Sequence, residues 1–304
     1  MSACCGPARN EGAVPEAAAP GLDDDAALVR ELAAVAGSDL RFVGLAGGTF
    51  LMGSEDPLAY PEDGEGPVRS VQVSPFAIAA TTVTVAQFAT FVAATGHVTD
   101  AERHGDSLVF KGLLPDELRE ASPSTAEAPW WRQVAGASWL RPEGPGSSVL
   151  CREDHPVTHV SQRDAAAYAA WVGARLPTEA EWEFASRGGL EQQPFPWGAE
   201  REPDGEPRMN TFPGEFPDHP GAPVGTVPAS SFPPNGYGLH SMTGNVWEWT
   251  SGRWSAADPR PVMRGGSYMC HASYCRRYRT SARTASTADT TLGHTGFRLA
   301  VDVV

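Results

Sequence analysis

The sequence predicts an α+β fold with much irregular, turn-rich backbone and few long helices. Hydrophobic residues make up 41% of the 304 positions and charged residues 20%, which is typical of a globular protein with a real core. Glycine (32) and proline (27) are frequent, yet together they stay below the level of low-complexity chains. Helix caps alternate with strand-like runs, without an internal repeat or a clear linker. We therefore expect a flexible tail over residues 1–22 and a single domain over residues 23–304.

Four helices are predicted from apolar periodicity and from residues that cap helix ends. The first covers residues 25–37, where Leu28, Leu32 and Val35 share a face and Gly37 ends the helix. The other three begin at capping boxes, which pair a Ser or Thr with an acidic or amide residue three positions later: Thr84 with Gln87, Ser161 with Asp164, and Thr178 with Glu181.

Strands are predicted near both ends of the chain. The first three cover residues 41–45, 49–52 and 68–78, and an acidic loop over residues 55–66 separates the last two. The final strand covers residues 296–303, because apolar residues alternate there at Phe297, Leu299, Val301 and Val303. Between residues 194 and 234 proline and glycine are dense, so regular structure should be sparse.

The net charge of −14 argues against binding to nucleic acid or to an anionic membrane surface. No segment approaches the roughly 18 uninterrupted apolar residues of a membrane span. The first residues lack the basic and apolar regions of a secretory signal, and five cysteines in a chain of this length do not make a disulfide scaffold. We therefore expect a cytoplasmic protein that contacts neither nucleic acid nor membrane.

Cys270 and Cys275 are the most informative pair of residues. They are five positions apart, so the backbone between them must bend if their sulfurs are to meet. No acidic residue lies between Asp258 and Asp289, whereas that interval contains arginines at positions 264, 276, 277, 279 and 283. A cationic neighbourhood would lower the pKa of a thiol, and two soft thiolates suit Cu(I) better than tetrahedral zinc. A redox-inert buried pair and an occasional disulfide are the alternatives.

Glu248 stands between Trp247 and Trp249, where an unpaired buried carboxylate would be costly. Calcium, bound by carbonyl oxygens and this carboxylate, is one way to balance the charge, and an arginine is the other. His155 and His159 are four positions apart, but Pro156 argues against the helix that would place them on one face for metal binding.

Taken together, these segments resemble the formylglycine-generating enzyme family, also called the sulfatase-modifying factor family. Its most specific motif here is Gly-Gly-Ser-Tyr-Met-Cys270-His-x-Ser-Tyr-Cys275. Other matching segments extend from about residue 42 to the end: residues 43–53, 96–103, 128–131, 141–146, 155–160, 175–183, 244–249 and 296–298. The resemblance implies an irregular, C-type-lectin-like α+β fold. It also implies an O2-dependent oxidase that converts the cysteine of a Cys-x-Pro-x-Arg segment in an unfolded sulfatase to Cα-formylglycine.

The resemblance also implies roles for individual residues. Cys270 and Cys275 would hold Cu(I), and the substrate thiolate would join as a third ligand. Three further residues match positions that line the active site of the family: Ser267, Trp247 and Tyr274. Asp106 and Ser107 match positions that receive the arginine of the substrate. Thr82 stands where the family has a second acid, so the recognition of that arginine should be weaker here.

Two calcium sites of the family are matched in part. The second site keeps Gly244, Val246 and Glu248, with Ser241 in place of the usual asparagine. The first site begins at Asn210 and Thr211, but the acidic loop that completes it is missing between residues 217 and 222, where Asp218 is the candidate substitute. The structural cysteines of secreted relatives are replaced by Thr280 and Leu299, which also favours a cytoplasmic protein. Cys4 and Cys5 lie in the predicted tail, and Cys151 stands alone in a loop, where we expect it to act as a small hydrophobic residue.

Two other functions remain as alternatives. One is a binding module of the same fold that recognises a peptide or a glycan without catalysis; the presence of both Cys270 and Cys275 argues against it. The other is an iron-dependent sulfoxide synthase, which needs an added helical domain and a His-x3-His-x-Glu motif. The nearest stretch here, His155 and His159, is followed by Ser161 at the glutamate position.

Overall fold

The computed structural model describes residues 22–35 and 40–303. The predicted tail lies outside the described residues except for Leu22, and so do Cys4 and Cys5. The predicted helices are present as α1 (Leu22–Val35), α2 (Val85–Thr95), α5 (Gln162–Trp171) and α6 (Glu179–Ser186). All three predicted capping boxes form, with both reciprocal hydrogen bonds in each.

Two short helices were not predicted, α3 (Asp100–His104) and α4 (Asp116–Ala121). The first of these begins at a fourth capping box, in which Thr99 pairs with Glu102. Single turns of 3-10 helix also occur at Pro61–Asp63, Lys111–Leu113 and Pro203–Gly205. Among the described helices, none is long and apolar enough to cross a membrane.

Five small sheets carry the rest of the regular structure. A three-stranded antiparallel sheet joins β1 (Phe42–Leu45), β4 (Phe76–Ala79) and β13 (Ala300–Asp302). Three two-stranded antiparallel sheets pair β2 (Gly48–Met52) with β3 (Arg69–Val73), β5 (Asp106–Phe110) with β6 (Trp131–Ala135), and β7 (Gly214–Glu215) with β8 (His219–Pro220). The predicted strand over residues 68–78 is therefore two strands, because Ser74-Pro75 separates them and proline has no N–H for a ladder.

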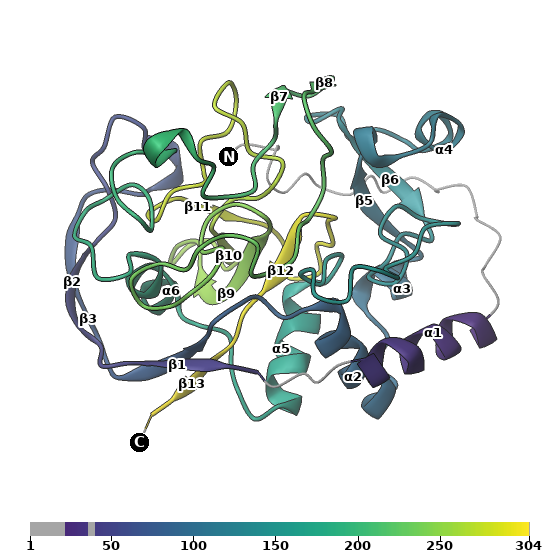
Figure 1. Ribbon diagram of the computed structural model, residues 1–304, viewed down its shortest axis with the longest axis horizontal. Helices are drawn as coiled ribbons and strands as arrows, with labels where there is room; N and C mark the ends of the chain where they lie inside the picture. The colour runs from purple at the N-terminus through teal and green to yellow at the C-terminus, as the bar shows by residue number, and fades with distance from the viewer. Residues whose placement is uncertain (1–21, 36–39, 304) are drawn as a thin grey trace.

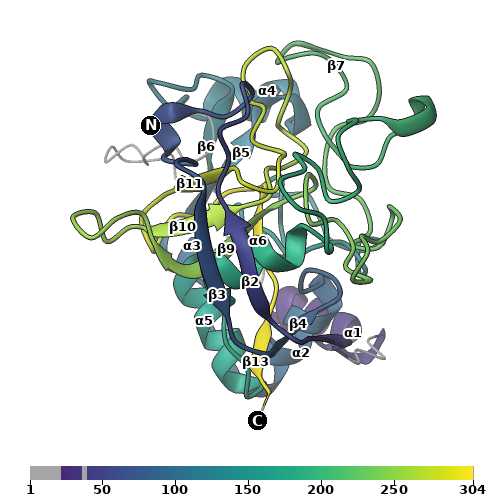
Figure 2. The same ribbon diagram turned by 90° about the vertical axis from the view of Figure 1, so that its left-hand side faces the viewer.

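The fifth sheet lies at the centre of the molecule and has the order β11-β10-β9-β12. Its strands are β9 (Trp247–Arg253), β10 (Pro261–Arg264), β11 (Arg283–Ala285) and β12 (Thr295–Phe297), and β12 runs parallel to β9. Helices α2 and α5 lie below this sheet in Figure 1, while long loops occupy the upper part of the view. Figure 2 shows β2 and β3 side by side along one flank.

The prediction of one final strand over residues 296–303 is wrong. The segment is divided between two sheets, with β12 beside β9 and β13 beside β4. Phe297 and Leu299 are fully buried as the alternation predicts, but Arg298 between them is also fully buried and Val303 is half exposed. The reason is that Arg298 forms an ion pair with the buried Glu248, which alternation of apolar residues cannot reveal.

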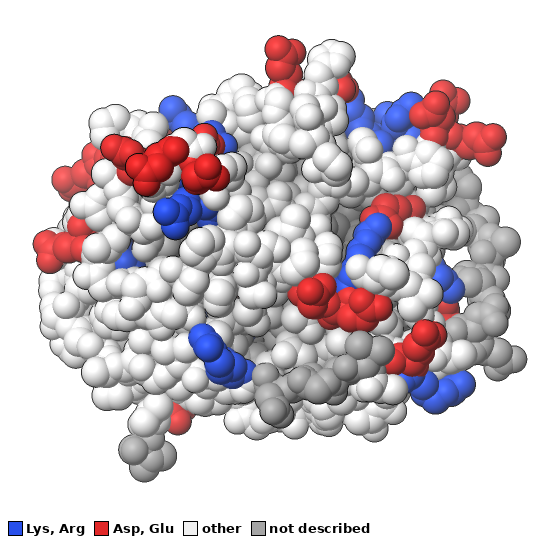
Figure 3. Space-filling view, viewed as in Figure 1, with Lys and Arg blue, Asp and Glu red and all other residues white. Residues whose placement is uncertain are grey.

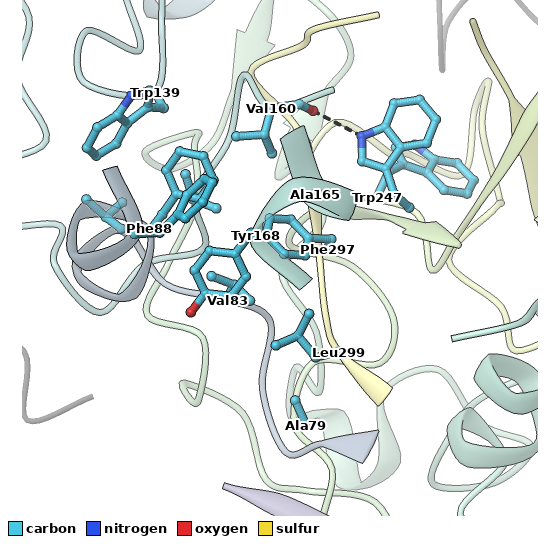
Figure 4. Close-up of a cluster of buried hydrophobic side chains, with 14 of the residues drawn as sticks. Ala79, Val83, Phe88, Trp139, Val160, Ala165, Tyr168, Trp247, Phe297 and Leu299 are labelled. Carbon is cyan, nitrogen blue, oxygen red and sulfur yellow. Dashed lines mark hydrogen bonds between the residues drawn. The ribbon is translucent and has the colours of Figure 1, made fainter. Parts of the chain in front are cut away.

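The main core lies where α2, α5 and β12 meet. The ring of Phe88 is 5.2 Å from Trp139, 5.9 Å from Tyr168 and 6.5 Å from Phe297 between centroids (Figure 4). Mixed edge-to-face and stacked contacts of this kind are favourable between aromatic rings. Helix α1 covers α2 with the buried side chains of Leu28 and Leu32, as the predicted face requires.

The segment from residue 194 to residue 234 is sparse in regular structure, as predicted. It contains one 3-10 turn and the short β7–β8 pair. Charged side chains on the face shown in Figure 3 occur in small groups separated by broad uncharged areas, and the described part of that face has no extended basic patch.

Replacing Thr84 with alanine is expected to lower the free energy of unfolding by about 1 kcal/mol, because the capping box of α2 is lost. Thr84 Oγ1 accepts the backbone N–H of Gln87 at 3.3 Å, and Gln87 Oε1 accepts the N–H of Thr84 at 2.9 Å. The control is Thr90→Ala in the same helix, which removes a bond to a helix carbonyl and should change stability by less than about 0.5 kcal/mol. Urea denaturation measures both, and equal losses would contradict the role of the cap.

Candidate active site around a buried cysteine pair

Cys270 and Cys275 meet inside the protein without a disulfide bond between them. Their sulfurs are 3.3 Å apart, and the side chains are 1% and 0% exposed. The distance is well beyond the roughly 2.05 Å of a disulfide bond. The backbone bends as expected, since the N–H of Cys275 donates to the carbonyl of His271 at 2.8 Å and that of Cys270 to Ser267 at 2.9 Å. Two soft sulfur donors therefore converge in a site from which solvent is excluded.

A glycine just before this turn is required by close packing. Gly266 has φ +72°, and a Cβ atom there would lie 2.8 Å from the carbonyl oxygen of Arg277. Any other residue would be strained by its backbone conformation and by this contact. The glycine at position 266 thus lets the segment before Cys270 pack directly against the backbone of Arg277, after Cys275.

Ser267 and Tyr274 stabilise the cysteine turn through hydrogen bonds near its two ends. The backbone N–H of Ser267 lies 3.4 Å from the sulfur of Cys270, and its hydroxyl bonds His294 Nδ1 at 2.9 Å. The hydroxyl of Tyr274 donates to the carbonyl of Met269 at 2.6 Å. Both predicted active-site residues are therefore part of the structure that holds the thiols in place.

Aromatic rings cover the cysteine turn. The ring of Tyr274 stacks on Phe216 with centroids 3.9 Å apart, and Trp130 meets both rings edge-on at 5.1 and 5.5 Å. Phe216 lies between β7 and β8, a segment for which the sequence predicted little structure. Trp247, the other predicted residue, is fully buried in β9 and belongs to the same apolar cluster as both cysteines. The thiols therefore lie in an apolar environment.

The expected cationic neighbourhood is balanced in large part by carboxylates from distant parts of the chain. Four of its five arginines form ion pairs: Arg264 with Glu183, Arg277 with Asp63, Arg279 with Glu65 and Arg283 with Glu179. A buried arginine needs such a partner, because an unpaired buried charge is strongly destabilising. Arg277 also lies close to the thiols, since its Nη1 is 4.0 Å from the sulfur of Cys275.

Asp106 and Ser107, predicted to receive the arginine of a substrate, lie at the start of β5 and are nearly or fully buried. Asp106 Oδ2 accepts the side-chain N–H of Gln133 at 3.1 Å. The hydroxyl of Ser107 lies between His159 Nδ1, at 2.8 Å, and Thr291 Oγ1, at 2.9 Å. A guanidinium that reached Asp106 would therefore meet an oxygen that already accepts a hydrogen bond.

One short segment links β5 to the cysteine turn. Thr291 bonds Ser107, and three residues later His294 bonds Ser267 beside the thiols. The backbone of Leu108 also pairs with this segment on both sides, through Thr291 and Gly293. The two predicted parts of the site, separated by about 160 positions in the sequence, are thus joined through residues 291–294. Neither Thr291 nor His294 was singled out by sequence reasoning.

A cavity of about 160 Å³ lies beside this link, and sequence reasoning did not find it. Its walls include Trp139, Glu143, Arg152, His155, His159 and Tyr268. The two histidines have separate partners: His155 Nδ1 bonds Thr226 at 2.9 Å, and His159 bonds Ser107. Within the described residues no three His, Cys, Asp or Glu side chains gather into a metal site.

Glu248, predicted as a calcium ligand, has an arginine as its partner. Arg298 donates to both carboxylate oxygens, at 2.6 and 2.7 Å, and the indole N–H of Trp182 donates at 2.8 Å. Gly244 and Val246 lie just before β9, while the hydroxyl of Ser241 donates to the carbonyl of Ala229 at 3.1 Å. Calcium favours several carboxylate and carbonyl oxygens, so a donor set whose carboxylate is already paired fits this ion poorly.

The residues predicted for the first calcium site fit no better. The amide N–H group of Asn210 donates to the carbonyl of Gly225 and to Asn245, and Arg201 donates to the hydroxyl of Thr211 at 3.1 Å. An arginine at this distance disfavours a second cation. Asp218, the candidate substitute ligand, pairs instead with Lys111 at 2.6 Å.

Two other residues singled out from the sequence, Thr82 and Cys151, differ in their exposure to solvent. Thr82 is buried and its hydroxyl has no partner within the described residues. Cys151 is exposed.

A family model described as "Sulfatase-modifying factor enzyme 1-like domain" matches residues 32–303. The chain belongs to this family. The formylglycine-generating enzyme of Thermomonospora curvata is 52% identical to it over 281 residues, which cover 86% of this chain and 93% of that protein. The protein of that name from Bos taurus is 46% identical, over 86% of this chain and 75% of its own. The predicted resemblance is thereby confirmed.

The family also includes a relative with a different name. A Bos taurus protein named inactive C-alpha-formylglycine-generating enzyme 2 is 44% identical, over 87% of this chain and 89% of its own. Membership of the sulfatase-modifying factor family therefore does not by itself decide activity. Among solved structures, PvdO from Pseudomonas aeruginosa has a TM-score of 0.61 at 24% identity, covering 86% of this chain and 94% of that one. Together with the family match, this likeness confirms the predicted irregular α+β fold.

Replacing Glu248 with glutamine is expected to lower the free energy of unfolding by about 3–5 kcal/mol, because Arg298 would lose its buried partner. The loss should be the same in calcium and in EDTA, since the partner is an arginine of the chain itself. Thermal unfolding of both proteins in both buffers measures this. A loss seen only when calcium is present would instead indicate that calcium is the partner of Glu248.

His159 is expected to weaken the fold in acid, because burial lowers its pKa from 6.5 to about 3. Below about pH 6.5 the unfolded chain binds a proton at this imidazole that the native state does not bind. The free energy of unfolding should therefore fall with pH by up to about 1.4 kcal/mol per unit for this group. His159→Asn, which suits the left-handed backbone here (φ +59°), should flatten that slope.

The control for this prediction is His219→Asn, a change at an exposed position. Urea denaturation between about pH 7 and pH 4.5 compares the three proteins. An unchanged slope in His159→Asn would contradict the assignment of the acid sensitivity to this buried imidazole.

Proposed function

We propose that this chain is a copper-dependent oxidase that converts the cysteine of a Cys-x-Pro-x-Arg segment in an unfolded sulfatase to Cα-formylglycine, using O2. The observation that carries the proposal is the convergence of the sulfurs of Cys270 and Cys275, 3.3 Å apart and buried, in a family whose 52%-identical member is named formylglycine-generating enzyme. The donor set fits Cu(I), because two soft thiolates in an apolar site suit a soft monovalent ion. When bound, copper would supply the redox chemistry with O2.

The residues of the chain perform the remaining work. The hydrogen bonds of Ser267 and Tyr274 hold the thiols in one place, so that a substrate thiol can approach a preformed pair. The rings of Trp130, Phe216 and Tyr274 exclude water from the reacting atoms. Asp106 would bind the arginine of the substrate and set its register, at the other end of the link through residues 291–294.

The proposed reaction is a two-electron oxidation of the substrate cysteine followed by hydrolysis. The CH2–SH group of the substrate loses two electrons and two protons to give a thioaldehyde. Water then replaces sulfur at that carbon, which gives the aldehyde and hydrogen sulfide. Full reduction of O2 to water takes two further electrons, which an external thiol reductant would provide. The substrate cysteine is thus oxidised while O2 is reduced.

The second candidate function is a binding module that recognises a peptide without catalysis. The relative named inactive, at 44% identity, keeps this alternative open. The two functions are separated by mass spectrometry of a Cys-x-Pro-x-Arg peptide after aerobic incubation with the Cu(I)-loaded protein and a thiol reductant. Conversion of the thiol to an aldehyde, dependent on copper, supports the enzyme. Binding of the peptide without conversion, in protein shown to be folded and loaded with copper, would support the module.

Cys270→Ser and Cys275→Ser are each expected to abolish this conversion, because a hydroxyl does not replace a thiolate as a soft metal ligand, and to leave the fold intact, because the two side chains are similar in size. The matched control is Cys151→Ser, which changes an exposed cysteine and should retain activity. Turnover of the peptide and the near-UV circular dichroism of all three variants provide the measurement. Activity in either of the first two variants would contradict the copper-dithiolate proposal.

A further inference from the structure

Asp63 and Arg277 form a buried ion pair directly behind Cys275. The Nε and Nη2 groups of Arg277 donate to the two oxygens of Asp63, at 2.5 and 3.0 Å, and both side chains are 2% exposed. This two-pronged pairing occupies one edge of the guanidinium and fixes its plane. The remaining nitrogen, Nη1, lies 4.0 Å from the sulfur of Cys275. The carboxylate is thus on one side of the guanidinium and the thiol on the other.

A second contact holds the same guanidinium in place. The ring of Tyr60 lies 4.2 Å from the guanidinium carbon of Arg277, and its hydroxyl accepts the backbone N–H of Arg276 at 2.9 Å. Tyr60 is in turn fixed by Glu65, which accepts its backbone N–H at 3.0 Å. The acidic loop over residues 55–66 therefore reaches the cysteine turn by two routes, through Asp63 and through Tyr60.

The position of Arg277 beside Cys275 matters because of the charge that the two thiolates would carry. Two thiolates that hold one monovalent ion carry a net charge of −1, and the site is buried. A buried charge is strongly disfavoured unless an opposite charge lies close to it. Arginine stays protonated at all relevant pH values and so can serve as that charge. Arg264, Arg279 and Arg283 direct their side chains to carboxylates elsewhere, and the guanidinium of Arg276 lies over the ring of Tyr60.

We propose that Asp63 is a positioning residue that holds Arg277 against the sulfur of Cys275, so that the positive end of this ion pair faces the two thiolates when they hold Cu(I). This inference rests on the proposed copper site and adds two residues to it, neither of which binds the metal or the substrate. Asp63 acts through Arg277, and Arg277 acts on the thiolate.

The protein contains a matched control for this proposal. Glu248 and Arg298 form a second buried, two-pronged ion pair, in which the same two nitrogens, Nε and Nη2, donate to the two carboxylate oxygens. Arg298 also donates to the carbonyls of Ala79 and His240. Asp63→Asn and Glu248→Gln thus remove equivalent buried carboxylates, but the arginine that pairs with Asp63 also lies 4.0 Å from the sulfur of Cys275.

The test is the affinity for Cu(I), measured anaerobically by competition with a coloured Cu(I) chelator, in full-length protein shown by circular dichroism to be folded. Asp63→Asn is expected to lower the affinity about 10–100-fold, as is common when a residue that orients a metal ligand is lost. Glu248→Gln should leave it close to that of the wild type. Equal losses in both variants, or unchanged affinity in Asp63→Asn, would overturn the proposal.

Substitutions of Arg277 provide a second test that does not depend on the folding of Asp63→Asn. Arg277→Lys keeps the positive charge without the two-pronged geometry, so its Cu(I) affinity should lie between those of the wild type and Arg277→Gln. Equal affinity of the lysine and glutamine variants would indicate that the pair serves the fold alone. Wild-type protein that bound no Cu(I) would overturn the proposed copper site and this inference with it, whereas wild-type binding with unaffected variants would overturn the inference alone.

Discussion

Buried ion pairs between arginines near the end of the chain and carboxylates near its beginning are the constraint on which the candidate site depends. Asp63 with Arg277 and Glu65 with Arg279 join two segments that otherwise lack regular structure around the cysteine turn. Loss of one partner of such a pair costs about 3–5 kcal/mol, against a typical net stability of about 5–15 kcal/mol. The acidic loop and the cysteine turn are therefore stable only together.

This dependence explains how an irregular backbone can hold two thiols in a defined place. Residues 265–282 form no strand or helix, so the turn has no ladder of backbone bonds to fix it. Side chains fix the turn instead: Ser267 bonds His294, Tyr274 bonds the carbonyl of Met269, and Arg277 pairs with Asp63. A site built in this way keeps the two thiols close together in an apolar environment. The arginine beside them is held by a carboxylate more than 200 positions away in the sequence.

The sequence predicted local structure where a short motif specifies it. Capping boxes at Thr84, Ser161 and Thr178 each marked a helix, because their hydrogen bonds lie within four residues. Prediction failed where a distant residue decides the outcome. The apolar alternation from Phe297 suggested one strand, but the ion pair of Arg298 with Glu248 draws the chain between two sheets. The same ion pair neutralises the charge of Glu248. From the sequence, either calcium or an arginine could have been its partner.

The sequence by itself determined the family, the α+β character, the four longer helices and the two cysteines that the proposed chemistry needs, because each depends on residue types at short spacing. The tertiary structure alone decided that these thiols meet at 3.3 Å, which carboxylate pairs with each arginine, and that residues 291–294 link Ser107 to Ser267. The physical reason is that a buried charge must find an opposite charge, and nothing in local sequence shows which one the fold brings to it.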